Sequence, residues 1–254
     1  MVMDFEENLV IRIEDLSKSF NGQVVLDGIS LDIYKGETVV ILGASGSGKS
    51  VLMSLLVGLL EADSGRIIIY GQDITEFTSE RQWQELRLKI GFLFQGSALY
   101  DSMTIAENIS FALEHQLDLP DERIRDIVRQ KLALVGLEGV EEKMPAELSG
   151  GMQKRAALAR AIAFEPRIVV YDEPTTGLDP IRGRQISELI LKLQNELRVT
   201  SVVVTHDLVC ASIVANRVAL LHEGRFRFVG TMEELKRSDD EYVQEFLESS
   251  TFRR

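Results

Sequence analysis

The chain has little cysteine and no apolar segment long enough to cross a membrane. Cys210 is the only cysteine among the 254 residues, so no disulfide can form within the chain, which suits a reducing compartment. The longest apolar run, residues 51–60, is interrupted by Ser54 and Gly58 and is far shorter than a bilayer-spanning helix. We therefore expect any membrane-spanning part of the system to be another chain.

The sequence also lacks an excess of positive charge. Its formal net charge is -12, whereas proteins that bind nucleic acid are usually basic, so DNA or RNA is disfavoured as the main partner. Residues 1–10 (MVMDFEENLV) are acidic and lack the basic start and apolar stretch of a secretory signal peptide. A chain of this length suffices for one large domain, or for a domain with an inserted subdomain.

Apolar patterns predict two kinds of strand. Residues 9–13 (LVIRI) and 29–33 (ISLDI) alternate, which is typical of antiparallel strands with one exposed face. Residues 38–42, 168–171 and 201–204 are nearly continuous apolar runs, which suit parallel strands covered on both faces. A helical stripe precedes the last run, formed by Ile186, Leu189, Ile190 and Leu193. This strand–helix–strand order predicts an α/β domain with a parallel sheet.

The middle of the chain has a different pattern. Between residues 78 and 163, only residues 90–94 look like a strand. Residues 121–135 carry a helical apolar stripe that ends at Gly136, a residue typical of helix ends. We interpret residues 97–160 as a mainly helical subdomain, inserted into the α/β core.

The last part of the chain predicts a hairpin and a helical tail. Residues 218–229 look like a hairpin that turns at Glu223 and Gly224, and residues 234–247 like a helix. One side of that helix is apolar, formed by Tyr242, Val243, Phe246 and Leu247. This side either packs on the chain's own core or docks a second subunit or a small accessory protein. We interpret residues 8–254 as a single domain, with residues 235–254 as its tail.

Residues 43–50 (GASGSGKS) match the pattern G-x-x-x-x-G-K-[ST] between a buried strand and a helix. The glycines let backbone N–H groups face a phosphate without a Cβ in the way, and the helix N-terminus adds partial positive charge. Lys49 can reach the β- and γ-phosphates, and the Ser50 hydroxyl can ligate Mg²⁺. The predicted nucleoside triphosphate site comprises Gly43, Ala44, Ser45, Gly46, Ser47, Gly48, Lys49 and Ser50.

Two acids end another predicted strand. Asp172 and Glu173 follow the apolar run that begins at Ile168, and the carboxyl end of a parallel strand is where ligands bind in such sheets. Asp172 is therefore a candidate Mg²⁺ ligand and Glu173 a candidate general base for the attacking water. His206 follows the strand pattern at residues 201–205 and is a third candidate to face the γ-phosphate.

A second predicted anion site lies at residues 148–152 (LSGGM). Ser149, Gly150 and Gly151 form a turn that opens an alanine-rich helix, so another helix N-terminus is free to receive an anion. Two such sites in one chain indicate a composite nucleotide site.

With these motifs in this order, the chain resembles the ATPase subunits of ABC transporters over nearly its whole length. In that family the pattern at 43–50 is the Walker A loop and LSGGQ is the signature motif. The resemblance implies a P-loop NTPase (RecA-like) core with a parallel sheet, an N-terminal antiparallel β-subdomain and an inserted α-helical subdomain. It also implies an ATP hydrolase that uses ATP and Mg²⁺.

The resemblance assigns roles to further residues. Phe20 matches the aromatic residue that stacks on adenine, and Gln95 matches the glutamine that touches Mg²⁺ and senses the membrane partner. Asp172 and Glu173 match the Walker B acids. The resemblance also makes Asp179 part of the D-loop and His206 the switch histidine.

The family further implies a head-to-tail homodimer. Each ATP lies between the Walker A loop of one subunit and Ser149 and Gly151 of the other. Hydrolysis opens the dimer, and the helical subdomain passes that motion to a membrane permease. The expected location is cytoplasmic, peripheral on the cytoplasmic face of the inner membrane.

One departure from the family pattern is Met152, where the signature usually has glutamine. We expect it to weaken a polar contact to the nucleotide across the dimer. The segments at 94–113, 144–163 and 171–181 are together similar to the Mla/Mce-type lipid-transport ATPases. That similarity implies a permease coupled to an MCE-domain protein that moves phospholipid or other lipids between membranes, with a small STAS-domain protein as a possible partner.

Three alternatives stay open at the level of sequence. Met152 and Tyr100 are also compatible with a generic importer ATPase for a polar solute. A soluble ABC protein without a transport role is disfavoured by the acidic charge, the single nucleotide domain and the lack of a long coiled-coil insertion. A scaffold that binds nucleotide without turnover is disfavoured by the intact pair Asp172 and Glu173.

Overall fold

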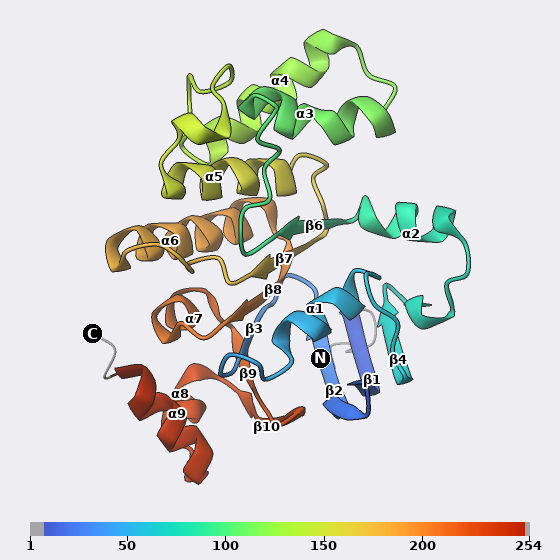
Figure 1. Cartoon of the computed structure of the whole chain (residues 1–254), viewed down its shortest axis with the longest axis vertical. Helices are drawn as coiled ribbons and strands as arrows, with labels where there is room; N and C mark the ends of the chain where they lie inside the picture. Colours follow the sequence, from blue (N-terminus) through green and yellow to red (C-terminus); the bar gives the residue numbers. More distant parts are fainter. Residues whose placement is uncertain (1–7, 252–254) are drawn as a thin grey trace, which may run out of the picture.

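The computed structural model describes residues 8–251. The first seven residues of the acidic start and the last three residues of the predicted tail lie outside this part of the chain. The described residues form a six-stranded sheet, a four-stranded sheet and a set of helices around both (Figure 1).

The six-stranded sheet has the order β10-β9-β3-β8-β7-β6. Its parallel members are β3 (Thr38–Leu42), β6 (Ile90–Leu93), β7 (Ile168–Asp172), β8 (Thr200–Thr205) and β9 (Arg217–His222). All residues of β3 and β8 are buried, as expected for parallel strands covered on both faces. The predictions of parallel strands at 38–42, 168–171 and 201–204 are confirmed.

The two faces of this sheet contribute to two different cores, because successive side chains of a strand point to opposite sides. Val40 and Leu42 belong to a core with the helices α5 (Gly150–Ala161), α6 (Pro180–Leu197) and α7 (Leu208–Val214). Val39 and Ile41 belong to a second core with α1 (Lys49–Leu56) and the four-stranded sheet. The strand β3 is therefore fixed from both sides, and the loop that follows it starts from a rigid position.

The four-stranded sheet is antiparallel, with the order β2-β1-β4-β5. Its strands are β1 (Leu9–Phe20), β2 (Gln23–Tyr34), β4 (Ser64–Ile69) and β5 (Gln72–Asp73). The alternation at 9–13 and 29–33 predicted this pairing, which is confirmed by the register between Ile11 and Ile33. A short 3-10 turn (Ile74–Glu76) and α2 (Glu80–Arg87) lead from this sheet to β6.

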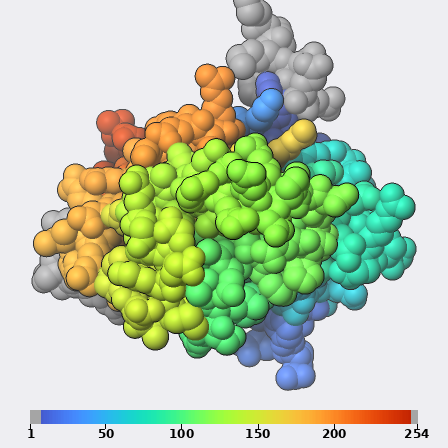
Figure 2. Space-filling view, turned by 90° about the horizontal axis from the view of Figure 1, so that it is seen from above, coloured from blue at the N-terminus to red at the C-terminus, as the bar shows by residue number. Residues whose placement is uncertain are grey.

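The predicted helical subdomain contains α3 (Ile105–Gln116), α4 (Asp121–Leu134), a 3-10 turn (Pro145–Glu147) and α5. It stands above the six-stranded sheet in Figure 1, and Figure 2 looks directly onto it. Burial of Ile124, Val128 and Leu132 against the core explains why the stripe at 121–135 is helical. Thr104 and Glu107 form a capping box at the start of α3.

The C-terminal part confirms the hairpin and corrects the helix. β9 and β10 (Arg225–Gly230) pair around Glu223 and Gly224, which both have positive φ. The single helix predicted at 234–247 is wrong, because the structure has α8 (Met232–Lys236) and α9 (Glu241–Thr251). Asp240 separates them: its carboxylate accepts a hydrogen bond from Val243 N at 3.1 Å, as a helix-capping side chain does.

The apolar side of α9 faces the chain's own core. Val243 is fully buried and Phe246 is 7% exposed, and both belong to the core that contains α5 and α6. Tyr242 stacks on His222 at the end of β9, with ring centroids 3.5 Å apart. Of the alternatives for this apolar side, the structure therefore shows packing on the core. Within residues 8–251, no helix combines the length and apolar character that crossing a membrane requires.

Candidate active site

The loop at 43–50 has a shape that only glycine permits at several positions. Gly46 and Gly48 have φ values of 82° and 104°, a region that side chains with Cβ rarely adopt. A Cβ on Gly43 would lie 2.5 Å from Ser47 Oγ and 2.6 Å from Leu221 O. The backbone of the loop therefore passes too close to its neighbours for other residues, and it ends in the N-terminus of α1.

Lys49 holds its ammonium inside this loop. Its Nζ donates hydrogen bonds to Gly43 O and Ala44 O, both at 2.9 Å, and its side chain is 6% exposed. Burial lowers the pKa of Lys49, and the charges of Glu173 and Asp172 oppose that shift. A buried cation at a helix N-terminus suits the predicted binding of an anion by this loop.

Glu173 collects hydrogen-bond donors from two strand ends. It is 8% exposed and has a left-handed backbone, with φ of 47°. Its Oε2 lies 2.9 Å from His206 Nδ1, 3.2 Å from Thr176 Oγ1 and 3.4 Å from Thr205 Oγ1. Its Oε1 lies 3.8 Å from Lys49 Nζ. The structure thus brings together the predicted lysine, acid and histidine.

Asp172 fits a metal-binding role. Its Oδ1 is buried and has no hydrogen-bond partner among the residues that the structure describes. Burial and the charge of Glu173 raise the pKa of Asp172, while Lys49 and Lys154 act in the opposite direction. Mg²⁺ takes oxygen ligands, and the exposed residues Ser50 and Gln95 carry two further side-chain oxygens that could bind it. The donor set therefore suits Mg²⁺.

The second anion site is separate from this cluster in the single chain. Ser149 Oγ accepts a hydrogen bond from Met152 N at 3.4 Å and so caps α5. Ser149 and Gly150 are exposed, and a Cβ on Gly151 would come no closer than 3.7 Å to the side chain of Arg182. Within residues 8–251, no hydrogen bond or ion pair joins this helix start to the loop at 43–50.

Two other predicted residues also lie outside the cluster. Phe20 ends β1, is 40% exposed and has Lys18 Nζ 5.4 Å from its ring centroid. Asp179 caps α6 by accepting hydrogen bonds from Ile181 N at 3.1 Å and Arg182 N at 3.0 Å. No contact of the described residues links either side chain to Glu173, so their predicted roles remain predictions.

Sequence reasoning missed three residues near the acids. Thr176 and Thr205 donate to Glu173, and Lys154 is close enough for its charge to act on Asp172 and Glu173. Thr205 directly precedes His206 and Thr176 follows Glu173 by three residues, which is the signal that could have indicated the two threonines. Lys154 belongs to the helix of the second anion site, and no sequence pattern placed it near the acids.

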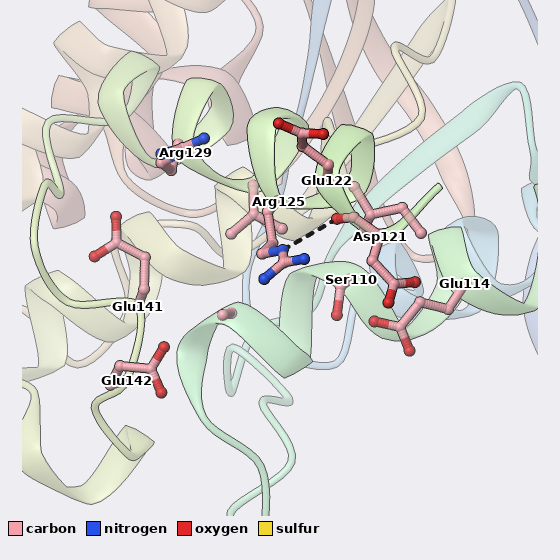
Figure 3. Close-up of a pocket in the computed structure, with 11 residues that line it drawn as sticks. Ser110, Glu114, Asp121, Glu122, Arg125, Arg129, Glu141 and Glu142 are labelled. Atoms are coloured by element: carbon pink, nitrogen blue, oxygen red, sulfur yellow. Dashed lines mark hydrogen bonds between the residues drawn. The ribbon is translucent and has the colours of Figure 1, made fainter. Parts of the chain in front are cut away.

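A groove of about 730 Å³ lies elsewhere, between α3 and α4 (Figure 3). Most of its polar lining residues are acidic. Arg125 also lines the groove, and its Nε donates a hydrogen bond to Asp121 O at 3.3 Å. None of its lining residues is a predicted site residue, and it has no phosphate-binding loop. The groove is therefore separate from the predicted nucleotide site around Lys49 and Glu173.

Comparison with known proteins places this chain in a family. A family model described as ABC transporter matches residues 26–176. The probable ribonucleotide transport ATP-binding protein mkl of Mycobacterium tuberculosis is 42% identical over 243 residues, covering 96% of this chain and 67% of that protein. The intermembrane phospholipid transport system ATP-binding protein MlaF of Haemophilus influenzae is 39% identical over 242 residues, covering 95% of this chain and 91% of that protein. The sulfate/thiosulfate import ATP-binding protein CysA of Bordetella parapertussis is 42% identical over 241 residues, covering 93% of this chain and 66% of that protein.

Solved structures agree with the fold. The dimeric ATP-binding cassette MJ0796, solved in a post-hydrolysis state bound to ADP and Pi, is 31% identical with a TM-score of 0.80, covering 87% of this chain and 98% of that one. The predicted RecA-like core with an antiparallel β-subdomain and a helical subdomain is confirmed. The chain belongs to the ABC transporter family, as a subunit that binds ATP with Mg²⁺ and hydrolyses it.

Proposed function

We propose that the chain is the ATP-hydrolysing subunit of an ABC transporter that moves lipid, phospholipid included, between membranes. A separate membrane permease and an MCE-domain protein carry the lipid. The observation that supports this proposal most is the similarity to MlaF over most of both chains. The segments at 94–113, 144–163 and 171–181, which contain Met152, agree with that similarity.

The residues of the cluster suit hydrolysis by a general base. Glu173 accepts the proton of the attacking water, and His206, Thr176 and Thr205 hold its carboxylate in place. Lys49 and the N–H groups of its loop bind the phosphates. Mg²⁺, when bound, neutralises phosphate charge and polarises the γ-phosphoryl group; Asp172, Ser50 and Gln95 are the residues that would hold it.

The second anion site suits a head-to-tail homodimer. The start of α5, where Ser149 and Gly150 are exposed, makes no hydrogen bond or ion pair with the loop at 43–50 of its own chain within residues 8–251, so it is open to the nucleotide of a second subunit. Met152 is partly buried and packs against the core. In this proposal the backbone at the start of α5, and not the Met152 side chain, contacts the nucleotide of the second subunit.

The helical subdomain offers a surface for the permease. Tyr100 and Phe111 are 50% and 38% exposed, with ring centroids 5.7 Å apart, and Tyr100 belongs to the segment that follows Gln95. Aromatic residues are enriched at protein interfaces relative to the rest of the surface. In this proposal the chain is peripheral on the cytoplasmic face of the inner membrane, and a small STAS-domain protein is a further candidate partner.

Copurification tests the proposal directly. The tagged chain is isolated from membranes in mild detergent, and copurifying proteins and lipids are identified by mass spectrometry. The lipid proposal predicts a multi-spanning permease, an MCE-domain protein and bound phospholipid. A permease with a solute-binding protein and no MCE-domain protein would contradict it. A Lys49→Ala chain, isolated in the same way, shows whether assembly depends on the nucleotide site.

The similarity to CysA supports a second candidate, an importer of a polar solute. The nucleotide chemistry of this candidate is the same, and only the partners and the cargo differ. In the copurification experiment it predicts a solute-binding protein in place of the MCE-domain protein. Stimulation of the complex's ATPase by that loaded binding protein, and not by phospholipid vesicles, would establish it.

A further inference from the structure

The segment that follows β6 has an unusual backbone. It contains Gln95, and two consecutive residues, Ser97 and Ala98, have positive φ values of 65° and 49°. Such conformations cost free energy in residues other than glycine and persist only where surrounding contacts enforce them. Ser97 is 5% exposed, whereas Gln95 and Gly96 are exposed. The contacts that hold this segment therefore decide where the Gln95 side chain stands.

Two cationic side chains of α5 supply those contacts. Lys154 Nζ donates a hydrogen bond to Gln95 O. Six residues later, Arg160 donates to Ser97 O at 3.0 Å and to Ala98 O at 2.7 Å. Three carbonyl groups of the segment, those of Gln95, Ser97 and Ala98, are thus bound by one helix, which is the helix that begins at the second anion site.

A third attachment comes from α3. Asn108 is 1% exposed, accepts a hydrogen bond from Tyr100 N at 2.7 Å and donates to Tyr100 O at 3.1 Å. Side chains of the helical subdomain therefore hold the backbone from Gln95 to Tyr100. Residues 95–100 pair with no strand of the central sheet.

Lys154 contacts this segment and is close enough to the Walker B acids for their charges to act on it. It is 4% exposed, and burial of an ammonium is costly unless charges or hydrogen bonds compensate. Asp172 and Glu173 provide that compensation, because both raise the pKa of Lys154 against the lowering caused by burial. One side chain of α5 thus contacts the backbone of Gln95 and acts electrostatically on the acids that end β7.

We propose that Lys154 is a positioning residue for ATP hydrolysis, because it ties the backbone of Gln95 to the helix that starts at Ser149. Arg160 provides the second attachment of the same segment. The Gln95 carboxamide and the second anion site then move as one unit, so the position of α5 determines whether the Gln95 oxygen stands near Mg²⁺. This inference rests on the proposed role of Gln95 as a Mg²⁺ ligand.

Hydrogen exchange of the full-length chain tests the attachment. Lys154→Met removes the donor and keeps an unbranched side chain, so we expect amide exchange in residues 95–100 to rise about tenfold, as for the loss of one charged hydrogen bond. Lys154→Arg keeps a cationic donor and should restore slow exchange. Lys143→Met removes an exposed lysine of the same subdomain and should leave exchange unchanged. Wild-type exchange at residues 95–100 in Lys154→Met would overturn the inference.

Steady-state kinetics and nucleotide binding test the positioning role. For Lys154→Met we expect kcat to fall about tenfold with little change in the KM for ATP, and the Mg²⁺ concentration at half-maximal rate to rise. Binding of a fluorescent ATP analogue should become less dependent on Mg²⁺. Lys154→Arg should recover each value, and Lys143→Met should match the wild type. Faster exchange without these changes would mean that Lys154 only stabilises the loop, and would overturn the positioning role.

Gln95→Ala separates the inference from the proposal on which it rests. If Gln95→Ala alters the Mg²⁺ dependence and Lys154→Met does not, only the inference about Lys154 fails. If Gln95→Ala leaves the Mg²⁺ dependence unchanged, the ligand role of Gln95 fails, and positioning by Lys154 fails with it. Thermal unfolding of all variants identifies loss of fold. Should Lys154→Met unfold, Lys154→Gln keeps a hydrogen-bond donor without the charge, and it should show the same changes at smaller size.

Discussion

Glu173 and His206 are in direct contact across two neighbouring strand ends, with Nδ1 of the histidine 2.9 Å from Oε2 of the carboxylate. A carboxylate can only accept, so this contact requires the proton on Nδ1 and leaves Nε2 free to face a substrate. The Glu173 side chain is nearly buried, whereas that of His206 is half exposed. The histidine therefore both orients the candidate base and reaches toward the solvent side of the site.

His206→Ala removes this orientation. We expect kcat to fall about 10- to 100-fold, because the base keeps only its two threonine donors and loses its alignment. The KM for ATP should change less than kcat, since Lys49 and the N–H groups of its loop still bind the phosphates. Steady-state ATPase assays check this, with His115→Ala, an exposed histidine distant from the acids in the sequence, as the matched control. An unchanged kcat would show that His206 takes no part in turnover.

Lys49→Ala removes the cation from the phosphate-binding loop. ATP affinity should fall about 10- to 100-fold, because a charge-assisted contact to phosphate is lost. Fluorescence titration with an ATP analogue measures the affinity, and Lys236→Ala provides the control, since that lysine is exposed. Equal affinity of Lys49→Ala and wild type would contradict the phosphate-binding role of the loop.

Asp172 links function to pH-dependent stability. Its pKa is raised, chiefly by burial, so the folded chain disfavours the ionised carboxylate. The free energy of unfolding should therefore fall as pH rises from the ordinary aspartate pKa, about 4, through the raised value. Asp172→Asn lacks this penalty. Without Mg²⁺ or nucleotide, it should unfold at a higher temperature than wild type at pH 7, and the difference should shrink toward pH 4.

The control for this prediction is Asp118→Asn, because Asp118 is exposed. Thermal unfolding followed by circular dichroism across pH 4 to 8 gives the comparison. If the wild-type chain is as stable as Asp172→Asn at pH 7, burial of the ionised Asp172 carboxylate does not lower the free energy of unfolding. The same substitution should nearly abolish Mg²⁺-dependent ATP hydrolysis, so stability and activity should change in opposite directions.

Gly43→Ala tests the close packing of the loop. Its Cβ would come within 2.6 Å of Leu221 O, a backbone atom that cannot move aside easily. We expect lower thermal stability, by about 1–3 kcal/mol of unfolding free energy, and weaker ATP binding. Gly183→Ala is the matched control, because its Cβ meets only Thr175 at 3.6 Å within helix α6. That variant should be neutral or slightly stabilised, as expected for alanine in a helix.

The sequence predicted those features that local patterns encode. Alternation in β1 and continuous burial in β3 and β8 depend on neighbouring residues, so their strands and pairing types could be inferred. The loop at 43–50 combines a fixed motif with its strand and helix. The geometry shows why that motif is constrained, since Gly43 has no room for a side chain.

Other features depend on contacts between distant segments. Lys154 is 59 residues away from Gln95, and nothing in the helical pattern of α5 shows that one lysine turns inward to another loop. The break before α9 lies in the polar stretch at 236–241 and depends on one side-chain cap, by Asp240. Such contacts follow from tertiary packing, which periodicity alone does not specify.

The most direct test of the account combines Glu173→Gln with light scattering. This variant keeps the shape of the base but cannot accept the proton, so turnover should fall about 100- to 10,000-fold while ATP binding persists. With Mg²⁺ and ATP, size-exclusion chromatography with light scattering should then show a stable dimer, and without ATP a monomer. Glu138→Gln, at an exposed position, should behave as wild type. Full turnover by Glu173→Gln, or a monomer in saturating ATP, would contradict a hydrolytic site that two subunits share.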